Sequence, residues 1–250
     1  MELQGRVVVV TGAASGLGES ITRAFAEAGS HVVVADRDGA TALNLVAELR
    51  AQGHTATGCE CDVTEEDDLR RLVAVAEGLG GVDVLVNNAG GWGGRPLQYP
   101  DAPPEDWSAV LDLNLRAPMR LLQLALADMR GRGEGAIVNV ASSAGIEASA
   151  YGSPPYAVAK AGLVRLTTTL ASLADEGTRV TCVVPGWIGL PRAHAERAAL
   201  SEQDRERSPE LVPPELAADE VVRLVREDTR AGTVVELLDG SRRRMVQPDG

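Results

Sequence analysis

A tyrosine and a lysine stand four residues apart, at Tyr156 and Lys160, in a segment with a helical pattern. Side chains at this spacing share one face of a helix, so the phenol and the ammonium are expected to lie side by side. A nearby positive charge favours the phenolate and lowers the phenol pKa from its usual value of about 10. Such a pair suits general acid–base chemistry between an alcohol and a carbonyl, although most isolated Tyr–Lys pairs are surface contacts.

Lys160 is the only lysine in a chain that carries 23 arginines. A chain that otherwise uses arginine for positive charge has an amine at this one position, which suggests that the position requires one. Coding bias with a single surviving lysine would give the same composition. Composition alone therefore leaves both interpretations open.

A glycine-rich segment, TGAASGLG at residues 11–18, follows an apolar run and precedes a helical pattern. Glycines at a strand-to-helix turn let backbone N–H groups approach a pyrophosphate at the positive end of the helix. A plain flexible turn is the alternative for the glycine pattern alone. Asp36 ends the next apolar run, where a carboxylate accepts hydrogen bonds from an adenosine ribose, and this context favours a dinucleotide site.

The residues around Asp36 favour NAD over NADP as the cofactor. The carboxylate would repel the 2′-phosphate of NADP, and Ser15 in the glycine-rich segment brings no charge to attract it. Arg37 is the counter-argument, because a guanidinium beside the ribose can hold a phosphate. The sequence therefore predicts NAD, with NADP as the weaker alternative.

The elements that must position these residues follow from the hydrophobic pattern, in which short apolar runs alternate with amphipathic stretches. Strands are expected at residues 6–11, 31–36, 55–61, 82–87, 136–140, 179–184 and 233–238, and helices at residues 17–28, 41–50, 65–77 and 156–175, with one or two more helices over residues 107–130. Strands that are apolar on both faces are typical of a parallel sheet covered by helices. The pattern predicts one α/β domain over residues 1–250, a Rossmann-like doubly wound parallel sheet of about seven strands.

Composition limits the partners and sites that are expected. The net charge of −12 argues against nucleic acid or an anionic membrane as a partner. The sequence contains no apolar run of the roughly 18 residues that span a membrane, and its first residues lack a signal-peptide pattern. Three cysteines and three scattered histidines argue against disulfides and a metal site, and favour a cytoplasmic location.

Further motifs complete a recognisable order along the chain. Asn-Asn-Ala-Gly at residues 87–90 ends an expected strand, at the edge where such sheets bind ligands. Together with TGxxxGxG at residues 11–18 and YxxxK at residues 156–160, this segment resembles the short-chain dehydrogenase/reductase family. The family's serine, 13 residues before its tyrosine, matches Ser143. The resemblance extends in order and spacing from residue 6 to about residue 186.

The resemblance implies an oxidoreductase that transfers hydride between a nicotinamide cofactor and the carbinol or carbonyl carbon of an alcohol or ketone. It implies that Tyr156 is the general acid–base, that Lys160 holds the nicotinamide ribose, and that Ser143 hydrogen-bonds the substrate oxygen. Asn114 is expected to hold a water that links Lys160 to solvent. The implied cofactor-binding residues are Gly12, Ser15, Gly16, Leu17, Gly18, Asp36, Asp62, Val63, Asn88, Ala89, Gly90, Tyr156, Lys160, Pro185, Gly186 and Ile188.

Two features depart from the family pattern. Where the family often has a threonine that contacts the nicotinamide carboxamide, this chain has Leu190, so that contact must be lost or made by another group. The arginine run at residues 242–244 is unusually basic for the family. It is expected to be a solvated or subunit-facing segment, with an anionic substrate or partner as the alternative.

The substrate-binding wall is expected at residues 92–100 and 187–214. Residues 189–214, rich in proline and charge, predict a long loop with some helix that covers the site, and disorder is the alternative. The motifs do not indicate which alcohol or ketone is bound.

The helix at residues 157–175 carries more apolar surface than one sheet face requires, and Leu166 is expected on its outward side. A homo-oligomer, a dimer or tetramer, is therefore predicted.

The alternative function is a nicotinamide-binding redox sensor without turnover, although such a sensor would be expected to have lost the tyrosine or the lysine. A Rossmann methyltransferase is a second alternative, in which the Tyr156–Lys160 pair has no role.

Overall fold

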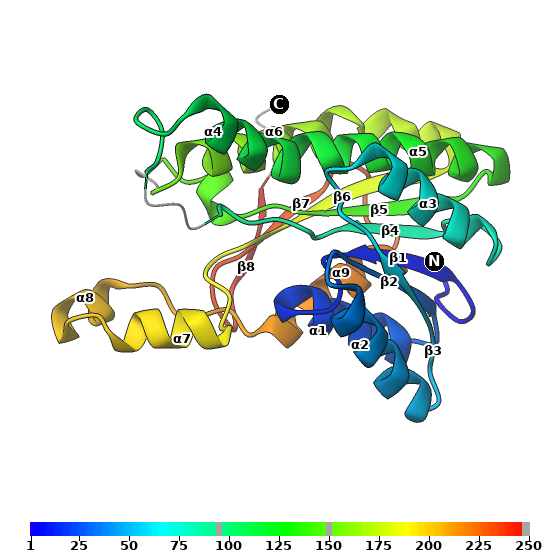
Figure 1. The fold of residues 1–250 in the computed structure, drawn as a ribbon, viewed down its shortest axis with the longest axis horizontal. Helices are drawn as coiled ribbons and strands as arrows, with labels where there is room; N and C mark the ends of the chain where they lie inside the picture. Colours follow the sequence, from blue (N-terminus) through cyan, green and yellow to red (C-terminus); the bar gives the residue numbers. More distant parts are fainter. Residues whose placement is uncertain (94–96, 149–151, 247–250) are drawn as a thin grey trace.

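A computed structural model describes residues 1–93, 97–148 and 152–246, and Figure 1 shows a sheet between two layers of helices. The strands in these residues are β1 (Val7–Thr11), β2 (His31–Asp36), β3 (Thr55–Glu60), β4 (Val84–Asn87), β5 (Gly135–Val140), β6 (Thr178–Pro185), β7 (Val234–Leu237) and β8 (Arg243–Val246). Their order across the sheet is β3-β2-β1-β4-β5-β6-β7-β8. Strands β1 to β7 are parallel, which confirms the doubly wound sheet predicted from the sequence.

The valines of β1 show why both faces of the sheet are covered. Successive side chains of a strand point to opposite faces. Val8 and Val10 pack in the same hydrophobic cluster as α1 (Gly16–Glu27), α2 (Gly39–Ala51) and α9 (Pro214–Arg226). Val7 and Val9 pack instead with α3 (Glu66–Glu77) and α5 (Ala117–Arg132). A strand that is apolar at every position is therefore buried on both sides, as parallel strands between helices must be.

The segment over residues 107–130, expected to hold one or two helices, holds two. Its first part is α4 (Pro104–Leu111), which passes through a π-helical turn at Asp112–Arg116 into α5. Pro118 has no N–H to bond to a carbonyl one turn earlier, so the regular helical ladder is interrupted where the helix widens. This turn carries Asn114, one of the predicted site residues.

The helix that carries Tyr156 and Lys160 is α6 (Pro154–Thr169), and it ends earlier than the sequence pattern predicted. A 3₁₀ segment, Ala171–Glu176, follows it. A second 3₁₀ turn, Ser143–Gly145, follows β5. The first half of α6 and this turn both lie at the carboxyl end of β5, so the topology brings the predicted catalytic segments together.

Residues 189–214 contain two helices, α7 (Pro191–Ala198) and α8 (Glu202–Arg207), which project from the body of the molecule as an arm (Figure 1).

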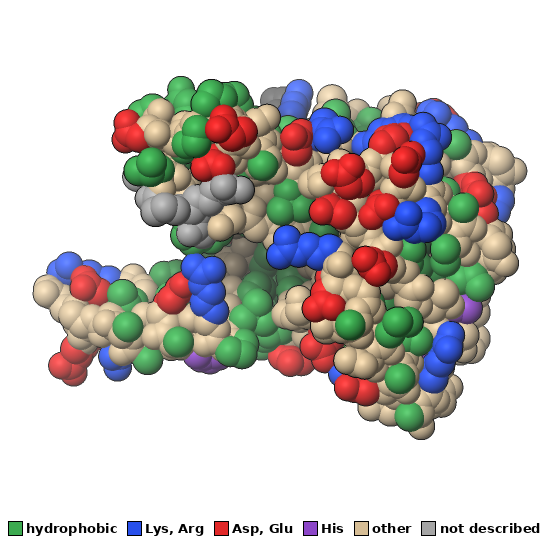
Figure 2. Space-filling model, viewed as in Figure 1, with side chains coloured by type: hydrophobic (Ala, Val, Ile, Leu, Met, Phe, Trp, Pro, Cys, Tyr) green, Lys and Arg blue, Asp and Glu red, His purple; other side chains and the backbone are tan. Residues whose placement is uncertain are grey.

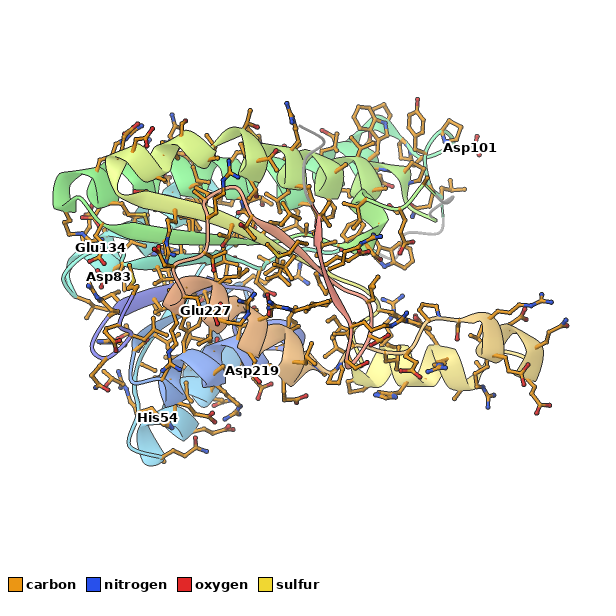
Figure 3. The ribbon with its side chains drawn as sticks, turned by 180° about the vertical axis from the view of Figure 1, so that it is seen from behind. His54, Asp83, Asp101, Glu134, Asp219 and Glu227 are labelled. Carbon is orange, nitrogen blue, oxygen red and sulfur yellow. The ribbon has the colours of Figure 1, made fainter. Side chains whose placement is uncertain are left out.

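Ion pairs lie at the opposite end of the sheet. Figure 3 shows Asp83 and Glu134 together on the side away from the arm. Arg6 donates to both carboxylates, at 3.1 and 2.7 Å, and Arg132 donates to Asp83 at 2.6 Å.

The arginine run is exposed, as the sequence predicted, and its last two residues, Arg243 and Arg244, begin β8. β8 pairs antiparallel with β7. Arg243 and Arg244 donate to Glu220 and Glu236 at 3.1 and 2.8 Å, and Arg242 bonds to Asp239. These three carboxylate residues are only 2–6% exposed, and burial of a carboxylate requires a partner. The three arginines therefore neutralise buried acids of the last strands and α9.

Within the described ranges, none of the helices is long and apolar enough to cross a membrane.

Candidate functional site

The glycine-rich loop leaves β1 in a shape that only glycine allows at two places. Gly12 and Gly16 have φ angles of +58° and +55°, in the left-handed region. A Cβ on Gly18 would lie 1.8 Å from the carbonyl oxygen of Gly12. The start of α1 therefore packs directly on the loop backbone, and the N–H groups of its first turn remain open to an anion. Ser15, the N-cap residue, is exposed and makes no side-chain cap.

Asn88 fixes this loop to the neighbouring strand. Its amide nitrogen donates to the carbonyl oxygens of Thr11 and Gly12, at 2.9 and 3.1 Å. The backbone N–H groups of Asn88 and Ala89 both donate to the Thr11 hydroxyl, at 3.1 and 3.0 Å. Asn88 and Ala89 thus lie at the predicted cofactor site and hold the loop through the backbone of β1, while Leu17 packs against the core below.

Asp36 points back toward the glycine-rich loop from the end of β2. One carboxylate oxygen accepts the N–H of Ala14 at 3.0 Å, and the other accepts the N–H of Asp38 at 3.1 Å. Asp38 also caps α2 by accepting the N–H of Thr41, and this bond lowers the pKa of its carboxyl. Arg37 is exposed and has no hydrogen bond within the described residues. The carboxyl groups of Asp36 and Asp38 therefore flank Arg37 along the chain.

Two further residues predicted to bind the cofactor, Asp62 and Val63, follow the end of β3. One carboxylate oxygen of Asp62 accepts the N–H and hydroxyl of Thr64, at 2.9 and 2.7 Å. Val63 is 8% exposed and lines a small cavity with Thr11 and Ala89, below the glycine-rich loop. Val63 is thus buried beside the loop, and Asp62 is half-buried just after β3.

Lys160 is buried under the carboxyl end of the sheet. Its Nζ donates to the carbonyl oxygen of Val140 at 2.8 Å and lies 5.6 Å from the ring centroid of Tyr156. Burial lowers the pKa of Lys160 to about 8, because the charged form loses its hydration. The ammonium keeps two more N–H donors that no described residue accepts, and it stands beside the phenol as the spacing predicted.

Asn114 is fully buried and connects the π-helical turn to the segment after β4. Its amide nitrogen donates to the carbonyls of Gly91 and Val110, at 2.7 and 2.8 Å, and its oxygen accepts the N–H of Gly91 at 3.0 Å. A Cβ on Gly90 would meet this oxygen at 2.7 Å and Lys160 Nζ at 3.1 Å. Because Gly90 has no side chain, a gap remains between the amide oxygen of Asn114 and the ammonium of Lys160.

Ser143 begins the 3₁₀ turn after β5, on the same side of the sheet as α6. The preceding Ser142 accepts the N–H of Ala144 at 3.3 Å, so its hydroxyl serves the turn and is not directed to the site. A Cβ on Gly145 would lie 2.6 Å from the α6 backbone at Ala161. The turn packs closely on α6, which brings Ser143 toward the turn of helix that carries Tyr156.

The Pro-Gly segment after β6 closes the cofactor side. Gly186 donates its N–H to the carbonyl of Leu237 at 2.9 Å, and Ile188 packs against the hydrophobic core. Leu190 reaches the glycine-rich loop, with its Cδ1 3.2 Å from where a Cβ on Gly16 would stand. The residue that replaces the family's threonine thus makes an apolar contact with the loop. Pro185 ends β6 beside Leu237.

One contact across the site was missed by the sequence analysis. The guanidinium carbon of Arg192, at the start of α7, lies 5.4 Å from the ring centroid of Trp92. Trp92 was placed in the expected wall at residues 92–100, of which residues 94–96 lie outside the described residues. The position of Arg192 two residues after Leu190 was the available signal, but it did not indicate the partner. Figure 2 shows a hollow between the arm and the part that carries α4 and α6.

The comparisons with known proteins agree with this geometry. The family model for short chain dehydrogenases matches residues 6–200. The human dehydrogenase/reductase SDR family member 4 is 39% identical over 190 residues, which cover 74% of this chain and 67% of that protein. The 3-oxoacyl-[acyl-carrier-protein] reductase of Thermotoga maritima is 35% identical over 218 residues, 85% of each chain.

A solved structure of a 7α-hydroxysteroid dehydrogenase, in complex with NADH and 7-oxo glycochenodeoxycholic acid, superposes with a TM-score of 0.84. It is 29% identical, and the match covers 96% of this chain and 95% of that one. The chain belongs to the short-chain dehydrogenase/reductase family, which confirms the resemblance read from its motifs. It is an oxidoreductase that transfers hydride with a nicotinamide cofactor.

Proposed function

We propose that the protein interconverts an alcohol and a ketone with NAD as its cofactor, and that Tyr156, Lys160, Ser143 and Asn114 carry the chemistry. The observation that carries this proposal is the buried ammonium of Lys160 beside the phenol of Tyr156, 5.6 Å from its ring centroid. A desolvated cation next to a phenol favours the phenolate. This effect serves acid–base chemistry and has no role in a purely structural contact.

The residues present fit a nicotinamide dinucleotide. A Cβ on Gly18 would collide with the loop, so glycine allows α1 to begin directly against it. The absence of side chains at Gly12, Gly16 and Gly18 also leaves the loop backbone open to a pyrophosphate. Each Asp36 oxygen accepts one backbone N–H and keeps capacity for a ribose hydroxyl. The other residues proposed to contact the cofactor are Ser15, Leu17, Asp62, Val63, Asn88, Ala89, Gly90, Pro185, Gly186 and Ile188.

The charges around Asp36 support NAD over NADP. A 2′-phosphate would meet the carboxylates of Asp36 and Asp38, which stand on both sides of Arg37 along the chain. Ser15 on the facing loop is neutral. The single guanidinium of Arg37 is exposed, where solvent weakens its attraction for a phosphate.

When bound, the nicotinamide accepts hydride from an alcohol or supplies it to a ketone. In the oxidative direction the phenolate of Tyr156 takes the hydroxyl proton of the substrate as the carbinol C–H bond gives up its hydride. Lys160 has two N–H donors beyond its bond to Val140, and these suit the ribose hydroxyls and a water. The Ser143 hydroxyl donates to the substrate oxygen and stabilises its developing charge.

Asn114 would hold a water that passes the proton from Lys160 to solvent. Both N–H groups of its amide donate to Gly91 and Val110, while among the described residues its oxygen accepts only the N–H of Gly91. The oxygen therefore has a lone pair for a water that also contacts Lys160, across the gap at Gly90. Asn114 would orient that water without moving, because its own side chain is fully anchored.

The assembly proposed is a homo-oligomer, a dimer or tetramer, formed through α5 and α6, which lie side by side on one face (Figure 1). Val158 on α6 and Met119 on α5 are 61% and 45% exposed. Apolar side chains exposed on adjacent helices favour a two-fold interface.

We also propose a cytoplasmic location, which the three unpaired and buried cysteines Cys59, Cys61 and Cys182 support.

The experiment that tests the function is a panel of alcohols and ketones, with NAD(H) and NADP(H) side by side, followed by the absorbance of the reduced nicotinamide. Turnover of at least one alcohol–ketone pair with NAD(H), lost in Tyr156→Phe, is the expected result. Tight NADH binding without turnover of any panel member would contradict the proposal and favour the redox sensor.

A further inference from the structure

Arg192 and Trp92 join the two walls of the substrate hollow. Trp92 follows Gly91, which Asn114 holds by two hydrogen bonds on the catalytic side. Arg192 follows Leu190, which touches the glycine-rich loop on the cofactor side. The 5.4 Å contact between the guanidinium and the indole therefore crosses from one side to the other.

Trp92 also lies near the start of the helix that carries Tyr156. It lines a pocket together with Trp107, Tyr99 and Pro155, and Pro155 is the residue before Tyr156 on α6. A substrate whose carbonyl reaches Tyr156 thus has an aromatic surface beside its stem. Three of the seven Trp, Tyr and Phe residues of this aromatic-poor chain lie around this pocket.

The guanidinium of Arg192 has donors to spare. Its Nε donates to Glu196 at 2.6 Å, one turn along α7. Its two terminal nitrogens make no hydrogen bond within the described residues, and its side chain is 66% exposed. A guanidinium presents its donors as a planar fork that matches a carboxylate, and an indole face holds the cation in place without consuming a donor.

We infer that Arg192 is a specificity-determining residue that selects substrates with an anionic group, a carboxylate, at the end of an apolar stem. The inference rests on the proposed function, because the reacting carbonyl must lie at Tyr156. The stem passes Trp92, and the carboxylate accepts hydrogen bonds from the terminal nitrogens of Arg192. Glu196 competes with the substrate by occupying Nε, so it weakens the attraction without abolishing it.

The test uses methyl ketones with a terminal carboxylate, CH3–CO–(CH2)n–COO⁻ of increasing chain length, and their methyl esters. The kcat/KM with NADH is measured for each matched pair. The wild-type protein should prefer the acid at one chain length. Arg192→Gln should reduce that preference about tenfold through KM, with kcat and the ester nearly unchanged, since a hydrogen bond to a charged group is lost.

Three further variants sharpen the result. Arg207→Gln removes one positive charge from α8, where Arg207 is exposed and has no hydrogen bond within the described residues, and it should keep the wild-type preference. Arg192→Lys should retain part of it, because the charge remains and the fork is lost. Glu196→Gln should raise the acid preference by releasing Nε. An unchanged preference in Arg192→Gln, or an equal loss in Arg207→Gln, would overturn the inference.

A binding measurement separates this inference from the proposed function. Saturated carboxylates of the same chain lengths and their methyl esters are titrated calorimetrically into the protein with NADH. Binding of the acid that weakens about tenfold in Arg192→Gln supports the inference even if no ketone of the series is turned over. Failure of every acid to bind more tightly than its ester overturns it, whether or not turnover is found.

Discussion

Lys160 donates a hydrogen bond of 2.8 Å to the carbonyl oxygen of Val140, the last residue of β5. This bond ties the helix that carries Tyr156 to the end of the sheet. The same burial that makes the bond direct also removes water from the ammonium and lowers its pKa to about 8. The burial of Lys160 thus accompanies the bond that holds its helix and lowers the pKa of the ammonium beside the phenol.

This burial predicts a pH-dependent stability. The pKa of Lys160 is about 8 in the folded protein, below its ordinary value of 10.5, so the unfolded chain binds more protons between these pH values. Stability contributed by this residue must then rise with pH in that window. The free energy of unfolding of the wild type, minus that of Lys160→Met, should increase from about pH 8 to about pH 10 in urea titrations. A difference that stays constant or falls would contradict it.

Loss of the phenolic hydroxyl should abolish most of the activity. Tyr156→Phe removes the proton-transfer group, and such groups contribute roughly 10²–10⁴ in rate. NADH binding and the unfolding midpoint should change little, because the ring remains. Tyr99→Phe is the matched control, since Tyr99 is 55% exposed and lies in the wall of the hollow. Retention of more than about a tenth of the activity in Tyr156→Phe would show that another group carries the proton.

Asp36→Ala should narrow the difference between NAD and NADP. The change removes hydrogen bonds to the ribose, each worth about 1.5–3 kcal/mol when one partner is charged, and removes the repulsion of a 2′-phosphate. Dissociation constants for NADH and NADPH are the measurement. Asp219→Ala is the control, because it deletes an exposed carboxylate on α9, labelled in Figure 3. Tighter binding of NADPH than NADH by the wild type would mean that Arg37 sets the preference.

The stability of the protein should depend on the ion pair between Glu236 in β7 and Arg244 in β8. Glu236 in β7 is 2% exposed and accepts a hydrogen bond from Arg244 in β8 at 2.8 Å. Arg244→Met leaves a buried carboxylate without its partner, which should cost about 3 kcal/mol. The double variant Glu236→Leu/Arg244→Met should recover most of that loss in urea unfolding. Equal destabilisation of the single and double variants would show that the pair is not the cause.

The sequence was sufficient for the strands whose residues alone require burial. The valine runs of β1 and β2 are apolar at nearly every position, so they were predictable as interior parallel strands. β8 was not predictable, because Arg243 and Arg244 belong in a strand only when Glu220 and Glu236 are already near. Contacts between residues far apart in the chain decide that strand, and a local pattern does not contain them.

In the site, too, local motifs predicted some residues, while contacts between distant parts of the chain decide their positions. The order of the motifs indicated Tyr156, Lys160 and Asn114, but the bonds that place them go to backbone atoms of Val140 and Gly91, which no side-chain pattern encodes. The outward position expected for Leu166 is only partly correct, because its side chain is half-buried. Leu166 packs against the cluster that contains Leu163, three residues earlier on the same helix face. The helix period could have given this result, whereas the contact between Arg192 and Trp92 required the fold.

The corrected face of α6 gives a sharper test of the assembly. Val158 is 61% exposed on α6, and Val158→Arg places a charge at the centre of the proposed interface. Light scattering should show a dimer or tetramer for the wild type and the 26.2 kDa monomer for the variant, with the unfolding midpoint of the monomer retained. Leu43→Arg is the matched control, because Leu43 is 62% exposed on α2, on the other side of the sheet, and should leave the assembly intact. A wild type that scatters as a monomer at micromolar concentration would show that the apolar surface of α5 and α6 does not form an interface between copies.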